Sequence, residues 1–158
     1  MTTTRMLLVF AVLSTSTATA MAGTMFRLEI GLPIAAGSDT KAKAVKNAVL
    51  VVRPVVCDDV ASVQITGTAE GMVNGARQSV AVKLIPVTPG VYAVQRQWPD
   101  GQWVLHLSGT CPAPKASAST IVAIRGTGFN REKTQVLREP ATRAQIETAL
   151  KDVLRSQS

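Results

Sequence analysis

The chain has 158 residues, with 17 Lys and Arg against 10 Asp and Glu, which is a formal net charge of +7. Hydrophobic residues make up 46% of it, enough for one packed domain and too many for a disordered chain. It contains one His, two Cys and one Tyr, so a metal cluster built from several histidines is excluded.

The first 22 residues have the three parts of a secretory signal peptide. Arg5 supplies the positive charge, an apolar block runs from Met6 to Leu13, and Ala20 and Ala22 form an A-x-A pattern. The apolar block is far shorter than the ~20 residues that span a bilayer. We predict cleavage after Ala22, or alternatively after Ala20, and a mature chain that is periplasmic or secreted and not transmembrane.

The net charge is unevenly distributed along the remaining chain. Residues 23–53 and residues 125–158 each carry a net charge of +3, whereas residues 54–124 are neutral. The basic excess therefore lies in the two flanks of the predicted domain. A high net charge that is confined to the flanks is weaker evidence for an anionic partner than the same charge spread evenly over the chain.

Cys57 and Cys111 are the two cysteines, and each ends a segment with strand-like composition. Disulfides persist in the compartment that an export signal predicts, so we expect the two to pair. The bridge would close a long loop and stabilise the fold by roughly 4 kcal/mol. A redox pair, a metal pair and free thiols are the alternatives, but C-x-x-C spacing is absent and only His106 is present as a histidine ligand.

Seven segments between residues 26 and 126 have the alternating or β-branched composition of strands, spaced by about 8–12 residues. They are residues 26–30, 48–57, 63–70, 78–87, 91–98, 102–111 and 119–126. Asn74-Gly75 is a strong two-residue turn signal, and Pro54 predicts a bulge or an edge within its segment. The pattern predicts an all-β, immunoglobulin-like antiparallel sandwich over residues 23–125.

Residues 143–155 change to a helical period and are predicted to form one amphipathic helix. Thr142 and Gln145 fit a capping box, and Glu147 stands four residues before Lys151, the order that favours an ion pair. An isolated helix of this length is marginal in water, so its apolar stripe must be buried on the sandwich, on a partner or on a second copy. Residues 126–142 are polar and are interpreted as a linker.

The segment from Pro89 to Gly109 carries a recognisable pattern, Gly90-x-Tyr92 followed by Trp98-Pro99-x-Gly101-x-Trp103-x-Leu105. It resembles a motif of small exported bacterial β-sandwich domains, the FixH-like and YtkA-like domains. The resemblance covers about 20 residues, and it implies a fold in which the Gly and Pro residues form turns and the aromatic residues fill the core. It implies no particular chemistry.

The sequence offers little material for catalysis. His106 lies in a strand, on the face opposite Trp103 and Leu105 and on the same face as Ser108, where a surface position is expected. The nucleophile pattern G-x-S-x-G is absent, and Gly126-Thr127-Gly128 is too short for a phosphate-binding loop. We therefore predict no catalytic residues, no cofactor and no enzymatic activity.

Metal binding is also disfavoured. Asp58 and Asp59 are adjacent and would point to opposite faces of an extended segment, so a calcium site there lacks ligands. Copper handling needs clusters of His and Met, but Met25 and Met72 are the only methionines after the predicted cleavage site.

Two functions from different classes remain. The first is a non-enzymatic exported binding or assembly module whose partner is another envelope or extracellular protein. The second is electrostatic attachment to an anionic envelope surface through the basic flanks and the C-terminal helix. Export and the lack of interleaved aromatic and basic residues argue against nucleic acid as a partner.

Overall fold

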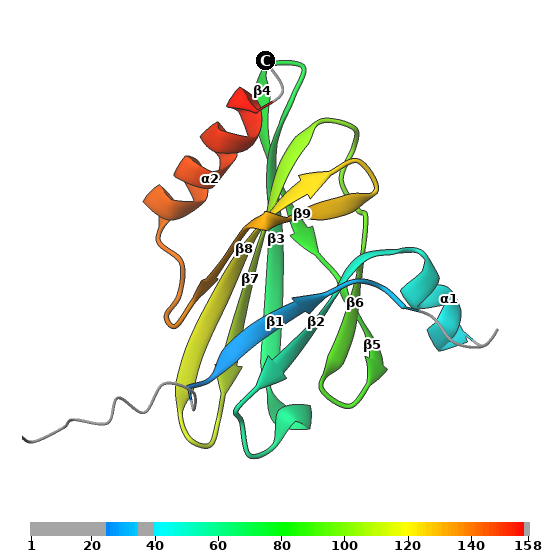
Figure 1. The fold of residues 1–158 in the computed structure, drawn as a ribbon, viewed down its shortest axis with the longest axis vertical. Helices are drawn as coiled ribbons and strands as arrows, with labels where there is room; N and C mark the ends of the chain where they lie inside the picture. The colour runs from blue at the N-terminus through cyan, green and yellow to red at the C-terminus, as the bar shows by residue number, and fades with distance from the viewer. Residues whose placement is uncertain (1–24, 35–39, 157–158) are drawn as a thin grey trace, which may run out of the picture.

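The computed structural model describes residues 25–34 and 40–156. The signal peptide predicted for residues 1–22 lies outside these ranges. Nine strands, two α-helices and one 3₁₀ turn are present among the described residues (Figure 1). In chain order they are β1 (Arg27–Gly31), α1 (Thr40–Lys46), β2 (Ala48–Val55), η1 (Val60–Ser62), β3 (Gln64–Val73), β4 (Ala76–Val82), β5 (Leu84–Thr88), β6 (Val91–Gln95), β7 (Gln102–Cys111), β8 (Ala116–Arg125), β9 (Gly128–Leu137) and α2 (Arg143–Arg155).

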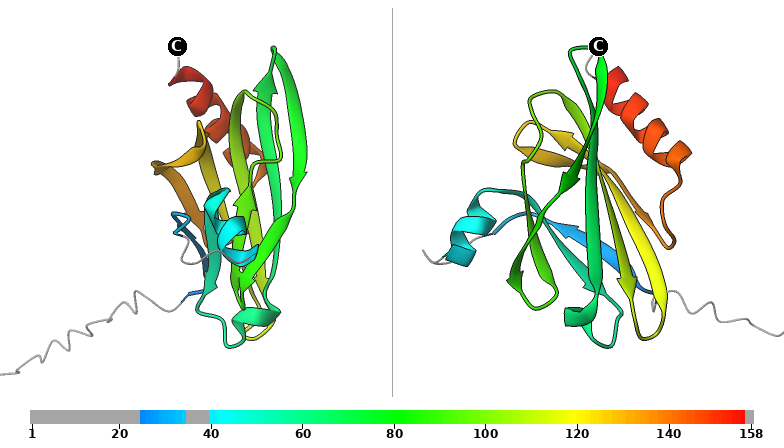
Figure 2. Two further views of the ribbon diagram at one scale, coloured as in Figure 1. Left: turned by 90° about the vertical axis from the view of Figure 1, so that its right-hand side faces the viewer. Right: turned by 180° about the vertical axis from the view of Figure 1, so that it is seen from behind.

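The strands form two antiparallel sheets, which confirms the predicted all-β sandwich. One sheet has four strands in the order β1-β2-β6-β5, and the other has five in the order β4-β3-β7-β8-β9. The two helices lie on different sides of this pair of sheets (Figures 1 and 2). Helix α2 covers the outer face of the five-stranded sheet, against β7 and β8.

The main core lies between the sheets and follows the period-2 alternation of the strands. In β7, Trp103, Leu105 and Leu107 point inward and are almost completely buried. Trp98 is also buried, and its ring centroid lies 6.2 Å from that of Trp103. The aromatic residues of the Trp98–Trp103 motif therefore fill the core.

Two local predictions are confirmed by the backbone. Asn74 and Gly75 both have positive φ, at 50° and 78°, as a tight turn between β3 and β4 requires. Pro54 pairs with Leu28 of β1, while β6 pairs with β2 only as far as Val52. Pro54 therefore occupies a position where the β6 side of β2 is unpaired, in agreement with the expected edge position.

The described residues form nine strands, two more than the seven predicted. One extra strand arises within the segment predicted over residues 78–87, and the other lies within the predicted linker. The segment predicted as one strand over residues 78–87 divides at Lys83, where the chain leaves the five-stranded sheet as β4 and enters the four-stranded sheet as β5. Val80, Val82 and Leu84 all contact the core across this change of sheet. Alternation alone does not distinguish one strand from two, because the inward-facing parity continues through Lys83.

The linker predicted for residues 126–142 is wrong for most of its length. Residues Gly128–Leu137 form β9, the edge strand beside β8. Its side chains are mostly exposed or half-buried, so no hydrophobic alternation marks it in the sequence. Gly126, with φ at 57°, lies in the turn that precedes it. The sandwich domain therefore extends beyond residue 125.

Cys57 and Cys111 form a disulfide, as predicted, with their Cα atoms 5.9 Å apart. Cys57 follows β2 of the four-stranded sheet and Cys111 ends β7 of the five-stranded sheet. The bond therefore joins the two sheets at one end of the sandwich. None of the helices in the described ranges is both long and apolar enough to cross a bilayer.

Candidate functional site

Helix α2 is held on the five-stranded sheet by its apolar stripe. Ile146, Ala149, Leu150 and Val153 are buried against Val104 of β7 and against Ile121 and Ala123 of β8. Full burial of a larger apolar side chain is worth about 1.5–3 kcal/mol, so this contact compensates for the instability of an isolated helix. Of the three alternatives for burying the stripe, the sandwich is the one observed.

The first turn of α2 is fixed by the predicted capping box. The Thr142 side chain accepts a hydrogen bond from the Gln145 backbone N–H, and the Gln145 side chain accepts one from the Thr142 N–H at 2.7 Å. These bonds satisfy N–H groups that have no partner within the helix. The start of the helix at Arg143 is thus determined locally, and Arg143 projects from its first turn.

A four-residue ion network joins α2 to strands β3 and β4. Glu70 of β3 has only 5% of its surface exposed, and it pairs with Arg77 of β4 at 2.5 Å and with Arg143 of α2 at 2.7 Å. Glu147 pairs with the same two arginines, each at 3.2 Å. The charges alternate around the network, so each carboxylate contacts two guanidinium groups.

The network shifts the pKa values of two of its members in the directions that favour the charged forms. Hydrogen bonds from Arg77 and then Arg143 lower the pKa of Glu147, and the hydrogen bond to Glu70 raises the pKa of Arg77. The expected pair of Glu147 with Lys151 does not form, because Glu147 points toward Arg77 and Arg143 instead. Only the Arg143–Glu147 spacing of four residues signals any part of this network in the sequence.

His106 lies beneath this region, on the outer face of β7 as predicted. Helix α2 covers that face, so His106 is half-buried rather than a surface residue. Burial lowers its pKa from the ordinary value of 6.5, and the nearby charge of Glu70 opposes this effect. Its Nε2 atom is buried and has no hydrogen-bond partner among the described residues.

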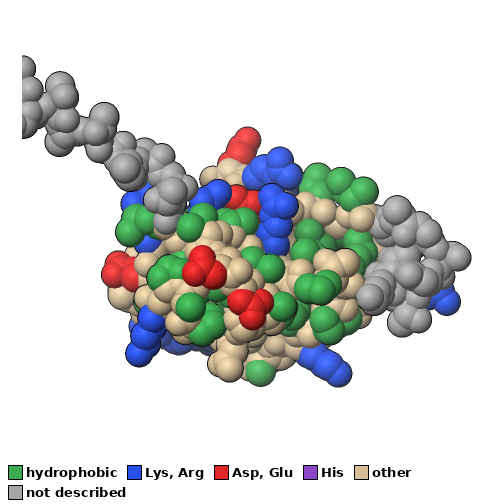
Figure 3. Space-filling model, turned by 90° about the horizontal axis from the view of Figure 1, so that it is seen from below, with side chains coloured by type: hydrophobic (Ala, Val, Ile, Leu, Met, Phe, Trp, Pro, Cys, Tyr) green, Lys and Arg blue, Asp and Glu red, His purple; other side chains and the backbone are tan. Residues whose placement is uncertain are grey.

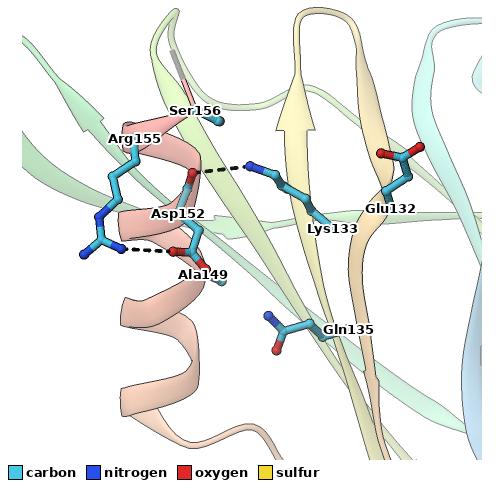
Figure 4. A pocket seen from close by; sticks show the side chains of 8 residues that line it. Glu132, Lys133, Gln135, Ala149, Asp152, Arg155 and Ser156 are labelled. Atoms are coloured by element: carbon cyan, nitrogen blue, oxygen red, sulfur yellow. Dashed lines mark hydrogen bonds and ion pairs between the residues drawn. The ribbon is translucent and has the colours of Figure 1, made fainter. Parts of the chain in front are cut away.

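A groove with a volume of about 420 Å³ lies between the C-terminal half of α2 and strand β9. Figure 4 shows the side chains of both walls. An adjoining hollow of about 310 Å³ shares three of its lining residues. We call the two together the α2–β9 groove; they are lined by Ala123, Ile124, Arg125, Asn130, Glu132, Lys133, Gln135, Ala149, Asp152, Val153, Arg155 and Ser156.

The walls of the groove carry charges of both signs above an apolar floor. Lys133 Nζ donates to the Asp152 backbone carbonyl at 3.4 Å, and the Asp152 carboxylate pairs with Arg155 at 3.6 Å (Figure 4). Ala123 and Ala149 form part of the floor. The groove is therefore suited to a segment that has both a small apolar side chain and a charged group.

The shape of the groove depends on an irregularity in β9. The pairing of β8 with β9 shifts between Ile121 and Ala123, so residues 131–134 lie outside the regular ladder. The Asn130 side chain stabilises this bulge by accepting hydrogen bonds from the N–H groups of Glu132 and Lys133. The bulge sets Lys133 within reach of α2, where a regular strand would have continued along β8.

A second hollow, of about 320 Å³, lies at the end of the sandwich that carries η1 and the β5–β6 turn. Seen from below, this end presents hydrophobic and acidic side chains side by side (Figure 3). Val56 and Val60 are among its exposed hydrophobic residues. Val56 has φ at 63°, a conformation that strains a β-branched residue.

The remaining residues considered for chemistry are not brought together. Asp59 caps η1 by accepting a hydrogen bond from the Ala61 N–H at 3.0 Å. Met25 accepts from Arg138, whereas Met72 lies beside α2. In the described part of the chain, no three His, Cys, Asp or Glu side chains form a potential metal-binding group.

The α2–β9 groove depends on α2 lying beside β8 and β9, and the ion network depends on α2 lying beside β3 and β4. Sequence reasoning missed them because residues that contact each other there are far apart in the chain, as Glu70 and Arg143 are at a separation of 73 residues. The chain matches no protein-family model, no curated protein and no solved structure.

Proposed function

We propose that this chain is an exported, non-enzymatic binding or assembly module. Its partner is another envelope or extracellular protein, and a segment of that partner occupies the α2–β9 groove. The proposal includes removal of residues 1–22 as a signal peptide, a periplasmic or secreted location, and an immunoglobulin-like relationship. The likeness of residues 89–109 to FixH-like and YtkA-like domains supports this class of exported sandwich.

Export is supported by two independent features. The first is the charged, apolar and small-residue pattern of residues 1–22. The second is the Cys57–Cys111 disulfide, which is typical of proteins that mature in an oxidising compartment.

The observation that carries the binding proposal is the α2–β9 groove. Its volume and its mixed lining match a short segment rather than a flat surface. Lys133 holds one long hydrogen bond to a backbone carbonyl, so an acidic side chain of a partner would gain a stronger, charge-assisted contact there. We expect the bound segment to carry at least one Asp or Glu.

Attachment to an anionic envelope surface receives less support, since it requires the apolar stripe of α2 to be free to contact that surface. That stripe is packed on β7 and β8, and Arg143 is paired with Glu70 and Glu147. The exposed Lys151 of the same helix would have to act without that stripe. Binding to vesicles of anionic phospholipid that disappears at high salt would favour attachment over a protein partner.

Photo-crosslinking in the producing cells tests the proposal. A photoreactive residue at Gln135, on the groove wall, should give a discrete adduct with one partner protein. Lys133→Glu should abolish this adduct, because it repels the acidic segment. Lys115→Glu makes the same charge change in the exposed turn between β7 and β8 and should leave the adduct intact. No adduct at Gln135, or equal adducts in both variants, would refute the groove as a binding site.

A further inference from the structure

The two sheets have four edge strands, β1 and β5 in one and β4 and β9 in the other. An open edge exposes unpaired backbone groups and recruits other strands, so proteins usually protect it. Strand β9 is protected by its bulge and by the charged residues within it. Strand β5 contains Pro86, beside an irregular pairing. In β1, the Thr120 hydroxyl donates to the Leu28 carbonyl at 3.2 Å.

Strand β4 lacks these protections. Its pairing with β3 runs without a shift from Gly67–Val82 to Val73–Ala76. It contains no proline, and its one charged side chain, Arg77, is turned toward Glu70 and Glu147 on the face of the sheet. This edge is a regular, seven-residue template for another strand.

The hairpin register identifies which backbone groups of β4 face outward. In a two-residue hairpin, the two residues that flank the turn form a hydrogen-bonded pair. Along the hairpin, hydrogen-bonded pairs then alternate with pairs that exchange no hydrogen bonds. Ala76 and every second residue after it therefore bond to β3. The N–H and C=O groups of Arg77, Ser79 and Ala81 point away from β3.

The edge has a defined end at Lys83. There the Gln97 side-chain amide accepts from the Lys83 N–H and donates to the Lys83 carbonyl, both at 2.9 Å, as a neighbouring strand would. Within the described residues we find no side chain that covers Arg77, Ser79 or Ala81 in this way. The open backbone groups are thus confined to the stretch between Arg77 and Ala81.

We propose that β4 pairs with β4 of a second copy of this chain, antiparallel, about a two-fold axis at Ser79. In this register Ser79 faces its own counterpart, and Arg77 faces Ala81 of the second copy. The facing pairs would exchange about six backbone hydrogen bonds and join two five-stranded sheets into one continuous sheet.

The side chains of β4 are self-complementary in this arrangement. The long Arg77 lies opposite the small Ala81, and no charged residue faces a like charge. Pairing with Glu70 and Glu147 holds Arg77 in place on this face of the sheet. A contact through one short strand is small beside the ~1,600 Å² of a standard interface, so the dimer should dissociate on dilution. This dimer does not depend on what the α2–β9 groove binds.

Sedimentation velocity of the purified, oxidised protein over a range of concentrations tests the proposal. The wild-type chain should pass from monomer to dimer. Ser79→Pro removes an outward N–H and should raise the dissociation constant at least about tenfold, whereas Ser79→Ala keeps that N–H and should leave it within about twofold. Circular dichroism and thermal unfolding check that each variant is folded.

Two further variants test the register without altering the backbone. Ala81→Lys sets a positive charge opposite Arg77 of the second copy and should weaken the dimer, whereas Ala81→Glu should strengthen it. A wild-type chain that stays monomeric at millimolar concentration would overturn the proposal. So would a dimer that is indifferent to Ser79→Pro, or one that Ala81→Lys and Ala81→Glu change in the same direction.

Discussion

Glu70 of β3 and Arg143 of α2 lie 73 residues apart in the sequence and form an ion pair of 2.7 Å. Glu70 is almost completely buried, whereas Arg143 is largely exposed. The pair fixes the first turn of α2 against the sheet, at the end opposite the α2–β9 groove contacts of Asp152 and Arg155. The buried carboxylate therefore positions the first turn of the helix, while the apolar stripe packs the rest of the helix on the sheet.

Replacing that carboxylate should loosen the helix. We expect Glu70→Gln to lower the free energy of unfolding by about 1–3 kcal/mol, because it weakens hydrogen bonds to two arginines. Urea denaturation measures the loss, and hydrogen exchange should show weaker protection in residues 143–155. The matched control is Glu29→Gln, which also contacts two arginines but on an exposed edge, and it should cost less than ~1 kcal/mol. Equal effects would show that burial of Glu70 contributes nothing.

The fold should lose stability in two steps as the pH falls. The pKa of His106 is lowered in the folded state, so the unfolded chain binds the proton more readily, and stability falls as the pH drops below 6.5. The pKa of Glu147 is also lowered, so its contribution is lost as the pH falls below 4.5. Thermal unfolding between pH 8 and pH 3 measures both steps.

A single variant separates the two steps. His106→Gln cannot take up the proton, so the decline between pH 6.5 and 4.5 should flatten, while the acidic step persists. A His106→Gln profile that overlies the wild-type profile throughout would contradict a role for this histidine. Fluorescence of the buried Trp98 and Trp103 is a suitable probe of unfolding.

Removal of the disulfide should destabilise the sandwich more than any surface change. The bond closes a loop of 54 residues in sequence separation, so replacing both Cys57 and Cys111 by Ser should cost roughly 4 kcal/mol. Chemical denaturation of the variant and of the reduced wild-type chain should agree. A loss below ~1 kcal/mol would mean that the unfolded chain is already compact near these residues.

Gly71 should be irreplaceable for a steric reason. A Cβ at this position would overlap the Trp103 ring and lie 2.5 Å from the Gln102 carbonyl oxygen. We expect Gly71→Ala to cost at least about 2 kcal/mol, because neither backbone nor indole can move freely. Gly128→Ala is the control, since a Cβ there meets nothing within 4 Å. Comparable melting temperatures for the two variants would contradict this account.

Much of the fold was predictable because its signals are local. The alternation in residues 102–111, the Asn74-Gly75 turn and the Thr142–Gln145 capping box each depend on residues within a few positions of one another. The pairing of Cys57 with Cys111 needed only the composition and the predicted compartment. In contrast, β9 carries no alternation, because it is an edge strand that buries little on either face.

The candidate site was not predictable, since none of its parts is recognisable alone. Lys133 and Asp152 meet only because the β9 bulge and the C-terminal half of α2 flank the same strand. The prediction that His106 lies at the surface was wrong for a related reason. The pattern indicates which face of β7 the residue occupies, but not that α2 covers that face.

The short-range features of this protein can be derived from its residues: a strand-rich body, its tight turns, the bounds of the last helix and the identity of the paired cysteines. Folding in three dimensions was needed to show that the chain changes sheets at Lys83, that Glu70 is buried under α2, and that β4 has an open edge. Alternation and capping are set by neighbouring residues, whereas burial and strand order depend on which distant segment packs against each face.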